Sequence, residues 1–534
     1  MFRSGNFIKR LAVNSIPVSR NSRSLGNAGQ LRRTLGFRSF SEATSKPRTS
    51  NLAGYFVGAA LVVAAGLLAD NQGLISLRPT SAFSTSKSKQ YASHEEVQMA
   101  ISELRESFPE KGYVSTEPDA LKTFGSSTNS YHPASPHSVV VQVRSTEDVV
   151  KVVNIARKYR IPIVAYSGAT SLEGHYSGVE TGSICLDMSA MDQILEIHEN
   201  DGDLVCQSGA RWEDINRVLK DKGIPLFFPL DPGPGATIGG MIGTGCSGTN
   251  AVRYGTARAE WFLNVTVVLA NGKVIKTRRR ARKSAVGFDS TKLFIGAEGT
   301  LGIVTEATLR LAPLVPTKVA MAQFPDVEHA VNAVQEILNA PDGAHIRTDS
   351  SIKQTAATVK GIFKKHGSER FEFAATQEQA DEMWENRKYA LMSTLSSGGD
   401  GTRVWTTDVC VPVSKLPELA YETKKDLVAS GLQSTIVGHV GDGNFHALIK
   451  FHDDKELPKV SEAVHRLVHR ALALDGTCTG EHGVGVGKKE YLIEELGENT
   501  VEFMHTIKEA LDPLNIMNPG KLYPEGKHVG KDHK

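Results

Sequence analysis

Apolar strands and amphipathic helices alternate along the chain from about residue 137. Ser138–Val143 is rich in β-branched residues, which predicts a buried strand. Ser145 or Thr146 then caps a predicted helix that opens with two acidic residues and continues with apolar residues on one face. Ile161–Ala165 predicts the next strand, and it ends in a glycine turn. The body of the chain is therefore expected to combine helices with sheets.

The N-terminal part has a different pattern. Residues 1–50 carry ten of the 61 basic residues and only one acid, Glu42, which is typical of a mitochondrial presequence. Leu52–Ala69 is an uncharged apolar run that would span roughly 27 Å as a helix, enough for the hydrocarbon core of a bilayer. We interpret residues 52–69 as a membrane anchor and residues 70–104 as a linker. A presequence followed by one anchor predicts the mitochondrial inner membrane, with the body in the intermembrane space, although a matrix orientation stays open.

The distribution of charge along the chain indicates which kind of partner it can bind. The formal net charge of +2 conceals an acidic body, because the presequence leaves it with 51 basic against 58 acidic residues. An acidic surface argues against nucleic-acid binding and suits a basic protein partner.

Two histidines flank a predicted tight turn in the segment His439–His446 (HVGDGNFH). If Asp442 and Gly443 form a two-residue turn, His439 pairs with His446 and their Cβ atoms lie about 4.5–5.5 Å apart on one face. That separation suits a divalent metal. Glu481 in the downstream GEHG motif could be the third ligand, leaving His482 free as a base. The alternative is an ordinary hairpin whose histidines face each other.

Three glycine-rich segments lie upstream of this hairpin. Ser167–Ser171 follows a predicted strand, where exposed backbone N–H groups can hold an anion. Asp231–Gly245 lacks the preceding strand of a dinucleotide fingerprint and is interrupted by prolines, so we interpret it as a loop lying close to a large planar ligand. Gly296–Thr305 leads into the predicted strand Ala307–Leu311.

These three segments, in this order, resemble the flavin-binding domain of the vanillyl-alcohol oxidase and p-cresol methylhydroxylase (PCMH) family. The histidine hairpin, the GEHG motif and the tail Asp512–Lys521 (DPLNIMNPGK) narrow the resemblance to the FAD-linked D-2-hydroxyacid dehydrogenases, over about residues 105–525. The resemblance implies an α+β fold. Residues 105–315 would form a PCMH-type FAD-binding domain of two α+β subdomains, residues 316–474 a cap with an antiparallel sheet, and residues 475–525 a segment that returns to the flavin.

The resemblance also implies the residues that hold FAD. The pyrophosphate would lie on the first glycine turn, formed by Ser167, Gly168, Ala169, Thr170 and Ser171. The flavin and ribityl chain would be lined by Pro232, Gly233, Thr237, Gly239, Gly240, Thr244, Glu298, Ile303 and Asn518. His175 raises the question of a covalent flavin bond, and we expect non-covalent binding.

The implied chemistry is the oxidation of a D-2-hydroxyacid. A divalent metal, Zn or Mn, on His439, His446 and Glu481 would bind the substrate's hydroxyl and carboxylate oxygens. His482 would remove the hydroxyl proton while the Cα hydride passes to the flavin, which then reduces cytochrome c. Two further residues are ambiguous. Arg387 would grip the substrate carboxylate or is simply a solvated helix residue, and Asn444 would donate to the substrate or only complete the turn.

The predicted cap departs from the family pattern. Two strands are expected after the strand near Lys318–Phe324 and the helix Val327–Leu338, but residues 340–350 are polar and turn-like, and the next helix covers Ile352–Lys365. We therefore expect an incomplete cap sheet. Three alternatives stay open: an inactive variant, a D-2-hydroxyglutarate dehydrogenase, and a hydrolase that uses the same metal site without flavin.

Overall fold

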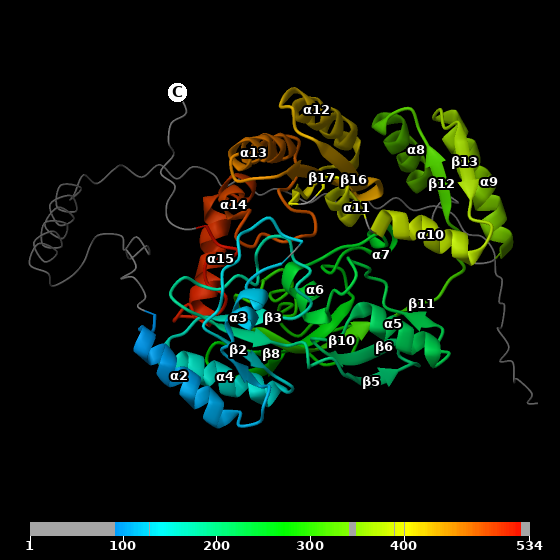
Figure 1. Ribbon diagram of the computed structural model, residues 1–534. Helices are drawn as coiled ribbons and strands as arrows, with labels where there is room; N and C mark the ends of the chain where they lie inside the picture. The colour runs from blue at the N-terminus through cyan, green and yellow to red at the C-terminus, as the bar shows by residue number, and fades with distance from the viewer. Residues whose placement is uncertain (1–90, 128, 341–348, 389, 400, 525–534) are drawn as a thin grey trace, which may run out of the picture. The chain divides into compact units, whose positions relative to one another are not determined.

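The computed structural model describes residues 91–524 apart from 128, 341–348, 389 and 400 (Figure 1). The predicted presequence (residues 1–50) and the predicted anchor Leu52–Ala69 lie outside the described residues. Among the helices of the described part, none is long and apolar enough to cross a membrane.

The first sheet has four strands in the order β1-β2-β4-β3. β2 (Val139–Gln142), β4 (Ile184–Asp187) and β3 (Ile163–Tyr166) are parallel, and β1 (Val114–Ser115) is antiparallel to β2. The predicted helix after β2 is confirmed as α4 (Thr146–Tyr159). Ser145 is its N-cap, because its side chain accepts a hydrogen bond from the backbone N–H of Asp148.

The predicted linker 70–104 is wrong at its C-terminal end. Residues His94–Ser107 form helix α2, which begins with a capping box between Ser93 and Glu96. Val97, Ala100, Ile101 and Leu104 are buried in the same core cluster as the apolar face of α4. The sequence interpretation weighed the Ser- and Lys-rich residues before Ser93 and missed the helical period of the apolar residues after it.

The second sheet is antiparallel and has the order β5-β6-β10-β8-β9. Its strands are β5 (Ile194–His198), β6 (Asp203–Gln207), β10 (Ile303–Arg310), β8 (Phe262–Val268) and β9 (Val274–Lys276). Two sheets with packed helices therefore make the two α+β subdomains that the family resemblance implied (Figure 1).

The second glycine-rich segment is not a loop throughout. It turns at residues 233–235 and then forms a short helix, α6 (Ile238–Thr244), despite its three glycines. Tertiary packing outweighs their poor helix propensity, because Ile238, Met241 and Ile242 are buried in the core. Gly239 is required there, since a Cβ atom would lie 2.9 Å from the Cβ of Ser208.

The described cap strands form two separate antiparallel sheets. One has the order β14-β17-β15, with β16 also paired to β17. The other contains β12 and β13 alone. The strands are β12 (Ala320–Gln323), β13 (Arg370–Phe373), β14 (Arg403–Thr406), β15 (Val409–Cys410), β16 (Ser434–His439) and β17 (Asn444–Phe451). The split agrees with the prediction of a sheet that lacks its middle.

Helices of the cap follow the predicted pattern closely. The strand and helix predicted at Lys318–Phe324 and Val327–Leu338 are β12 and α8 (Val327–Asn339), and the helix predicted at Ile352–Lys365 is α9 (Asp349–Lys365). Most of the polar segment between α8 and α9 lies outside the described residues. The remaining cap helices are α10 (Gln377–Lys388), α11 (Ala390–Ser396), α12 (Leu416–Ala429) and α13 (Leu457–Ala473).

The C-terminal segment returns to the first sheet, as the family resemblance implied. After α14 (Leu492–Leu496) and α15 (Glu498–Leu511), Met517 forms a parallel bridge with Ile163 at the free edge of β3. Lys508 is buried and donates to the carbonyls of Thr300 and Met517, at 2.8 and 2.7 Å. The tail is thus fixed against both subdomains.

The remaining elements of the flavin domain are short. They are α3 (Pro118–Phe124), α5 (Trp212–Asp221), β7 (Leu226–Phe227), α7 (Ala251–Tyr254) and β11 (Ala312–Pro313).

A buried histidine makes the first subdomain sensitive to acid. Burial lowers the pKa of His137 to about 4, and its Nε2 faces the carbonyl oxygen of Tyr176 at 3.0 Å. The unfolded chain, with an ordinary histidine pKa of about 6.5, binds more protons between pH 6.5 and 4 than the folded chain does. Stability from this residue is therefore present above pH 6.5 and is lost as the pH falls toward 4, by roughly 3 kcal/mol at most.

His137→Gln should separate this effect from other acid effects. We expect the variant to be less stable than the wild type at pH 7, because it loses part of the buried hydrogen bonding. The difference in unfolding temperature between the wild type and the variant should become smaller as the pH approaches 4.5. Calorimetry at several pH values would measure this difference. A difference that does not change with pH would contradict a neutral buried histidine.

Candidate active site

The histidine hairpin has a different register from the predicted one. His439 pairs with Asn444, and His446 pairs with Val437. The chain turns through the four residues Val440–Gly443 rather than two. Gly443 has φ +78° and lies so close to β15 that a Cβ atom would be 2.0 Å from the carbonyl oxygen of Val411. The predicted pairing of His439 with His446 is wrong, because the turn packs at Gly443 against Val411, the residue that follows β15, and accepts its backbone N–H at 3.0 Å.

Both histidines nevertheless reach the same side of the hairpin. The register differs from the prediction by two residues, and side chains in a strand alternate with a period of two, so the faces are unchanged. The two imidazole rings lie 5.8 Å apart between centroids. Nε2 of His439 and Nε2 of His446 approach the same carboxylate oxygen, Oε1 of Glu481, at 3.1 and 3.2 Å.

The hydrogen bonding of His446 favours a cation among these three groups. Its Nδ1 lies 3.1 Å from the carbonyl oxygen of Thr407, which can only accept, so Nδ1 carries a proton. In the neutral ring the Nε2 lone pair then faces a carboxylate oxygen, an arrangement that needs a proton or a metal ion between them. Two imidazoles and one carboxylate also form an established ligand set for zinc. His439, His446 and Glu481 therefore fit a divalent metal.

His482 lies beside this group and is suited to accept a proton. Its ring stacks on that of His446, with centroids 4.8 Å apart and planes 11° from parallel. Burial lowers the pKa of His482 to about 4, against the opposing charge of Asp408. The ring is therefore neutral near pH 7, and it lines the cavity described below.

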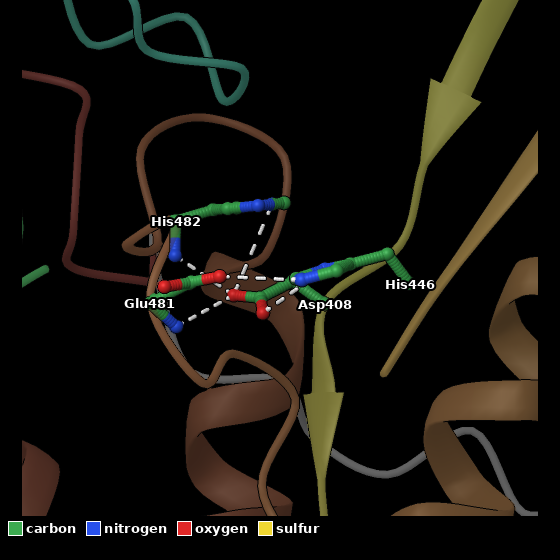
Figure 2. A group of neighbouring side chains, drawn as sticks. All are labelled: Asp408, His446, Glu481 and His482. Atoms are coloured by element: carbon green, nitrogen blue, oxygen red, sulfur yellow. Dashed lines mark hydrogen bonds and ion pairs between the residues drawn. The ribbon is translucent and has the colours of Figure 1, made fainter. Parts of the chain in front are cut away.

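Asp408 holds the GEHG loop in place, and the sequence analysis missed it. Its Oδ2 accepts the backbone N–H groups of Glu481 and His482, each at 2.8 Å (Figure 2). The same oxygen accepts the hydroxyl of Thr479, at 2.8 Å. Its Oδ1 accepts the amide of Asn444 at 2.9 Å. Asp408, His446, Glu481 and His482 each have a candidate ligand atom within 4.8 Å of the others. The oxygens of Asp408 already accept these hydrogen bonds, so we assign it to positioning rather than ligation.

Asp408→Asn should test this role. Three donors converge on Oδ2 and a fourth on Oδ1, so an amide NH₂ in either orientation would face another donor. We expect metal affinity and kcat to fall by about 10–100-fold, as for other groups that orient metal ligands. Titration with Zn²⁺ and steady-state kinetics would measure both losses, with Asp454→Asn, at an exposed carboxylate, as the control. Unchanged metal affinity would contradict a positioning role.

The structure bears differently on Asn444 and Arg387, the two residues whose roles the sequence left open. Asn444 is buried, and its amide group donates to Asp408 and to the carbonyl of Val409 at 3.0 Å. It is not among the residues that line the cavity, which favours the structural alternative over donation to substrate. Arg387 belongs to α10, but its side chain lies outside the described residues. The same helix contributes Asp381 and Trp384 to the cavity wall.

One cavity of about 1300 Å³ brings the predicted residues together. Its walls include every residue predicted to hold FAD: Ser167, Gly168, Ala169, Thr170, Ser171, Pro232, Gly233, Thr237, Gly239, Gly240, Thr244, Glu298, Ile303 and Asn518. His439, His446, Glu481 and His482 line the same cavity. The volume exceeds the roughly 300–1,000 Å³ of most ligand pockets, so it suits a large cofactor together with a small substrate.

The cavity wall also presents polar groups that fit FAD. Ser167 Oγ, Thr237 Oγ1 and Asn518 Oδ1 are buried and have no hydrogen-bond partner among the described residues. Ala169 has φ +50°, the left-handed conformation that turns successive backbone N–H groups toward an anion. The donor set of the first glycine turn therefore suits a pyrophosphate.

Glu298 has a second role that its position in the sequence did not reveal. Its Oε1 and Oε2 accept the N–H groups of Val484 and Gly485, at 2.6 and 2.9 Å. His175, the candidate for a covalent flavin bond, lies with Nε2 3.1 Å from Glu298 Oε1 and also contacts Ser171. Glu298 and Asp408 thus hold the loop 480–485 from two sides, one carboxylate from each domain.

Comparison with known proteins agrees with this arrangement. Residues 137–278 match the model of the FAD binding domain, and residues 343–522 match that of the C-terminal domain of FAD linked oxidases. The solved structure of p-cresol methylhydroxylase aligns with a TM-score of 0.62 at 18% identity, covering 81% of this chain and 97% of that one. At this identity the likeness concerns the fold, which is that of the PCMH-type flavoproteins.

Relatives that are similar in sequence define the family more narrowly than the fold does. The chain is 42% identical over 446 residues to "D-lactate dehydrogenase [cytochrome], mitochondrial" of Arabidopsis thaliana, covering 77% of this chain and 78% of the relative. It is 40% identical over 439 residues to the corresponding Saccharomyces cerevisiae protein, covering 74% of each. The chain belongs to the FAD-linked D-lactate dehydrogenase (cytochrome) family. The alternative of a flavin-free hydrolase is therefore wrong.

Proposed function

We propose that this protein oxidises D-lactate to pyruvate, with FAD as the hydride acceptor and cytochrome c as the electron acceptor. The observation that carries the proposal is the convergence of two imidazole Nε2 atoms on Glu481 Oε1, beside neutral His482, in the cavity that the flavin loops line. A 2-hydroxyacid needs these functions together: a group that binds two neighbouring oxygens, a base, and a hydride acceptor.

Each residue of the site would have a separate task. When bound, FAD accepts the hydride and a divalent ion lowers the pKa of the substrate hydroxyl. His439, His446 and Glu481 would hold that ion. His482 would take the hydroxyl proton as the Cα–H bond breaks, since its low pKa keeps it neutral at pH 7. Asp408 would hold His482 and Glu481 through their backbone N–H groups.

Binding of the substrate carboxylate is assigned to Arg387. The helix that carries Arg387 borders the cavity through Asp381 and Trp384, and a guanidinium can hold a carboxylate with two parallel hydrogen bonds. We also propose that the protein is mitochondrial and is anchored in the inner membrane by residues 52–69, with its body in the intermembrane space. The acidic body would suit the basic surface of cytochrome c.

Steady-state reduction of cytochrome c by the purified full chain tests this function. We expect D-lactate to give at least ten times the kcat/KM of L-lactate. Faster turnover of D-2-hydroxyglutarate would instead support the related dehydrogenase, which shares every motif of the site. A protein that binds FAD and metal but turns over none of these acids would favour the inactive variant, for which the split cap sheet is the structural reason.

A further inference from the structure

An exposed basic loop with an apolar tip connects β9 to the segment that precedes β10. Thr277–Ser290 has no regular secondary structure, and its length of 14 residues is unusual for a connection inside a compact domain. No residue between 276 and 290 lines the cavity, so the proposed reaction does not account for the loop.

The charge of this loop is opposite to that of the body. Six basic residues lie between positions 276 and 283, and no acidic residue occurs between Glu260 and Asp289. Arg280 is neutralised by Asp201 and Asp203, at 2.7 and 2.9 Å. Arg279 and Lys283 are exposed and form no ion pair within the described part of the chain. Their charge is therefore available to a partner.

The tip of the loop exposes two large apolar side chains. Val286 is 91% exposed and Phe288 is 79% exposed, the highest values among the exposed large hydrophobic residues of the described chain. The base of the loop is nevertheless fixed, because Ser290 Oγ donates to the carbonyl of Thr277 at 3.1 Å and Thr277 Oγ1 contacts Thr291 Oγ1 at 2.8 Å. A fixed base holds the apolar tip out into solvent.

We propose that the loop 277–290 docks the protein body on an anionic phospholipid surface, with Val286 and Phe288 inserted among the acyl chains. Adjacent cationic and apolar side chains are the combination that interfacial segments use, since the cations bind anionic headgroups and the apolar groups leave water. A basic protein such as cytochrome c would be repelled by the same charges, so the loop is distinct from the proposed acceptor site. The proposal does not depend on the identity of the substrate.

A tryptophan at the tip would report insertion even in a chain that carries its own apolar N-terminal segment. Full-length Phe288→Trp would be mixed with vesicles of phosphatidylglycerol and bromine-labelled phosphatidylcholine. The emission of the four native tryptophans, measured in the unsubstituted chain, would be subtracted. We expect the added emission to be quenched by about half, because interfacial side chains reach some 5–10 Å into the region where bromine quenches. Phe503→Trp, at an aromatic residue of α15 that is 63% exposed, is the matched control and should not be quenched.

A second variant tests whether the loop needs its cationic side chains to dock. Arg279→Glu with Lys283→Glu, in the Phe288→Trp chain, should lower the equilibrium constant for insertion of the tip, read from the quenching at position 288, by about 25-fold or more, since each cationic residue contributes roughly fivefold. An unchanged flavin spectrum and unfolding temperature would show that this variant is folded. Absence of quenching at position 288, equal quenching by vesicles of bromine-labelled phosphatidylcholine alone, or equal quenching at position 503 would each overturn the proposal.

Discussion

Glu481→Gln is expected to release the metal and to lower kcat/KM with D-lactate by about 10²–10³-fold. In the structure one oxygen of Glu481 faces Nε2 of both His439 and His446, so the substitution removes the only anionic member of the ligand set. A metal that polarises a substrate oxygen contributes several kcal/mol to transition-state stabilisation, and each 1.36 kcal/mol is tenfold in rate.

The measurement combines metal analysis with kinetics. Purified wild type and Glu481→Gln would be dialysed against the same buffer, analysed for Zn and Mn, and assayed with D-lactate. Glu490→Gln, in the same C-terminal segment but outside the cavity, is the control and should keep both metal and activity. Full activity in a chelator-treated wild type would contradict a catalytic metal even if Glu481→Gln were impaired.

His482→Asn is expected to lower kcat by about 10²–10⁴-fold, the usual contribution of a general base. The ring is neutral because burial lowers its pKa to about 4, and it stacks on His446, the proposed metal ligand. Its backbone N–H, which Asp408 accepts, is retained in the variant. The loop and the metal should therefore stay in place while the proton acceptor is lost.

Rapid mixing with D-lactate distinguishes this loss from misfolding. The variant should contain the same FAD and metal as the wild type, while the bleaching of its flavin absorbance becomes slower by the same factor as kcat. His469→Asn, at an exposed histidine of α13, is the control. A variant that reduces its flavin at the wild-type rate would remove His482 from the chemistry.

The glycine turns and the two histidines could be recognised from the sequence because each belongs to a short motif of neighbouring residues. The glycine is visible in the sequence even where its reason is a distant contact: at Gly168 an added Cβ atom would lie 2.6 Å from the carbonyl oxygen of Gly235. The prediction placed His439 and His446 on the correct face of the hairpin although its turn was wrong. The predicted register was in error by two residues, and a shift of two keeps each side chain on the same face.

Contacts between distant segments were not predictable in the same way. Asp408 lies more than seventy residues before the loop that it holds, and an acidic residue in a β-branched run is the only local signal of its role. The turn at Gly443 lies against the carbonyl of Val411, the residue that follows β15. Both features need the strand order of the cap, which apolar periodicity does not give.

Anaerobic single-turnover reduction of the bound flavin tests the central claim most directly. The purified full chain would be mixed with D-lactate or L-lactate in the absence of cytochrome c while its visible flavin absorbance is recorded. We predict that D-lactate bleaches the flavin at a rate no slower than kcat and that L-lactate bleaches it at least ten times more slowly. Equal rates with the two enantiomers, or no bleaching by either in a chain that holds both FAD and metal, would contradict the account.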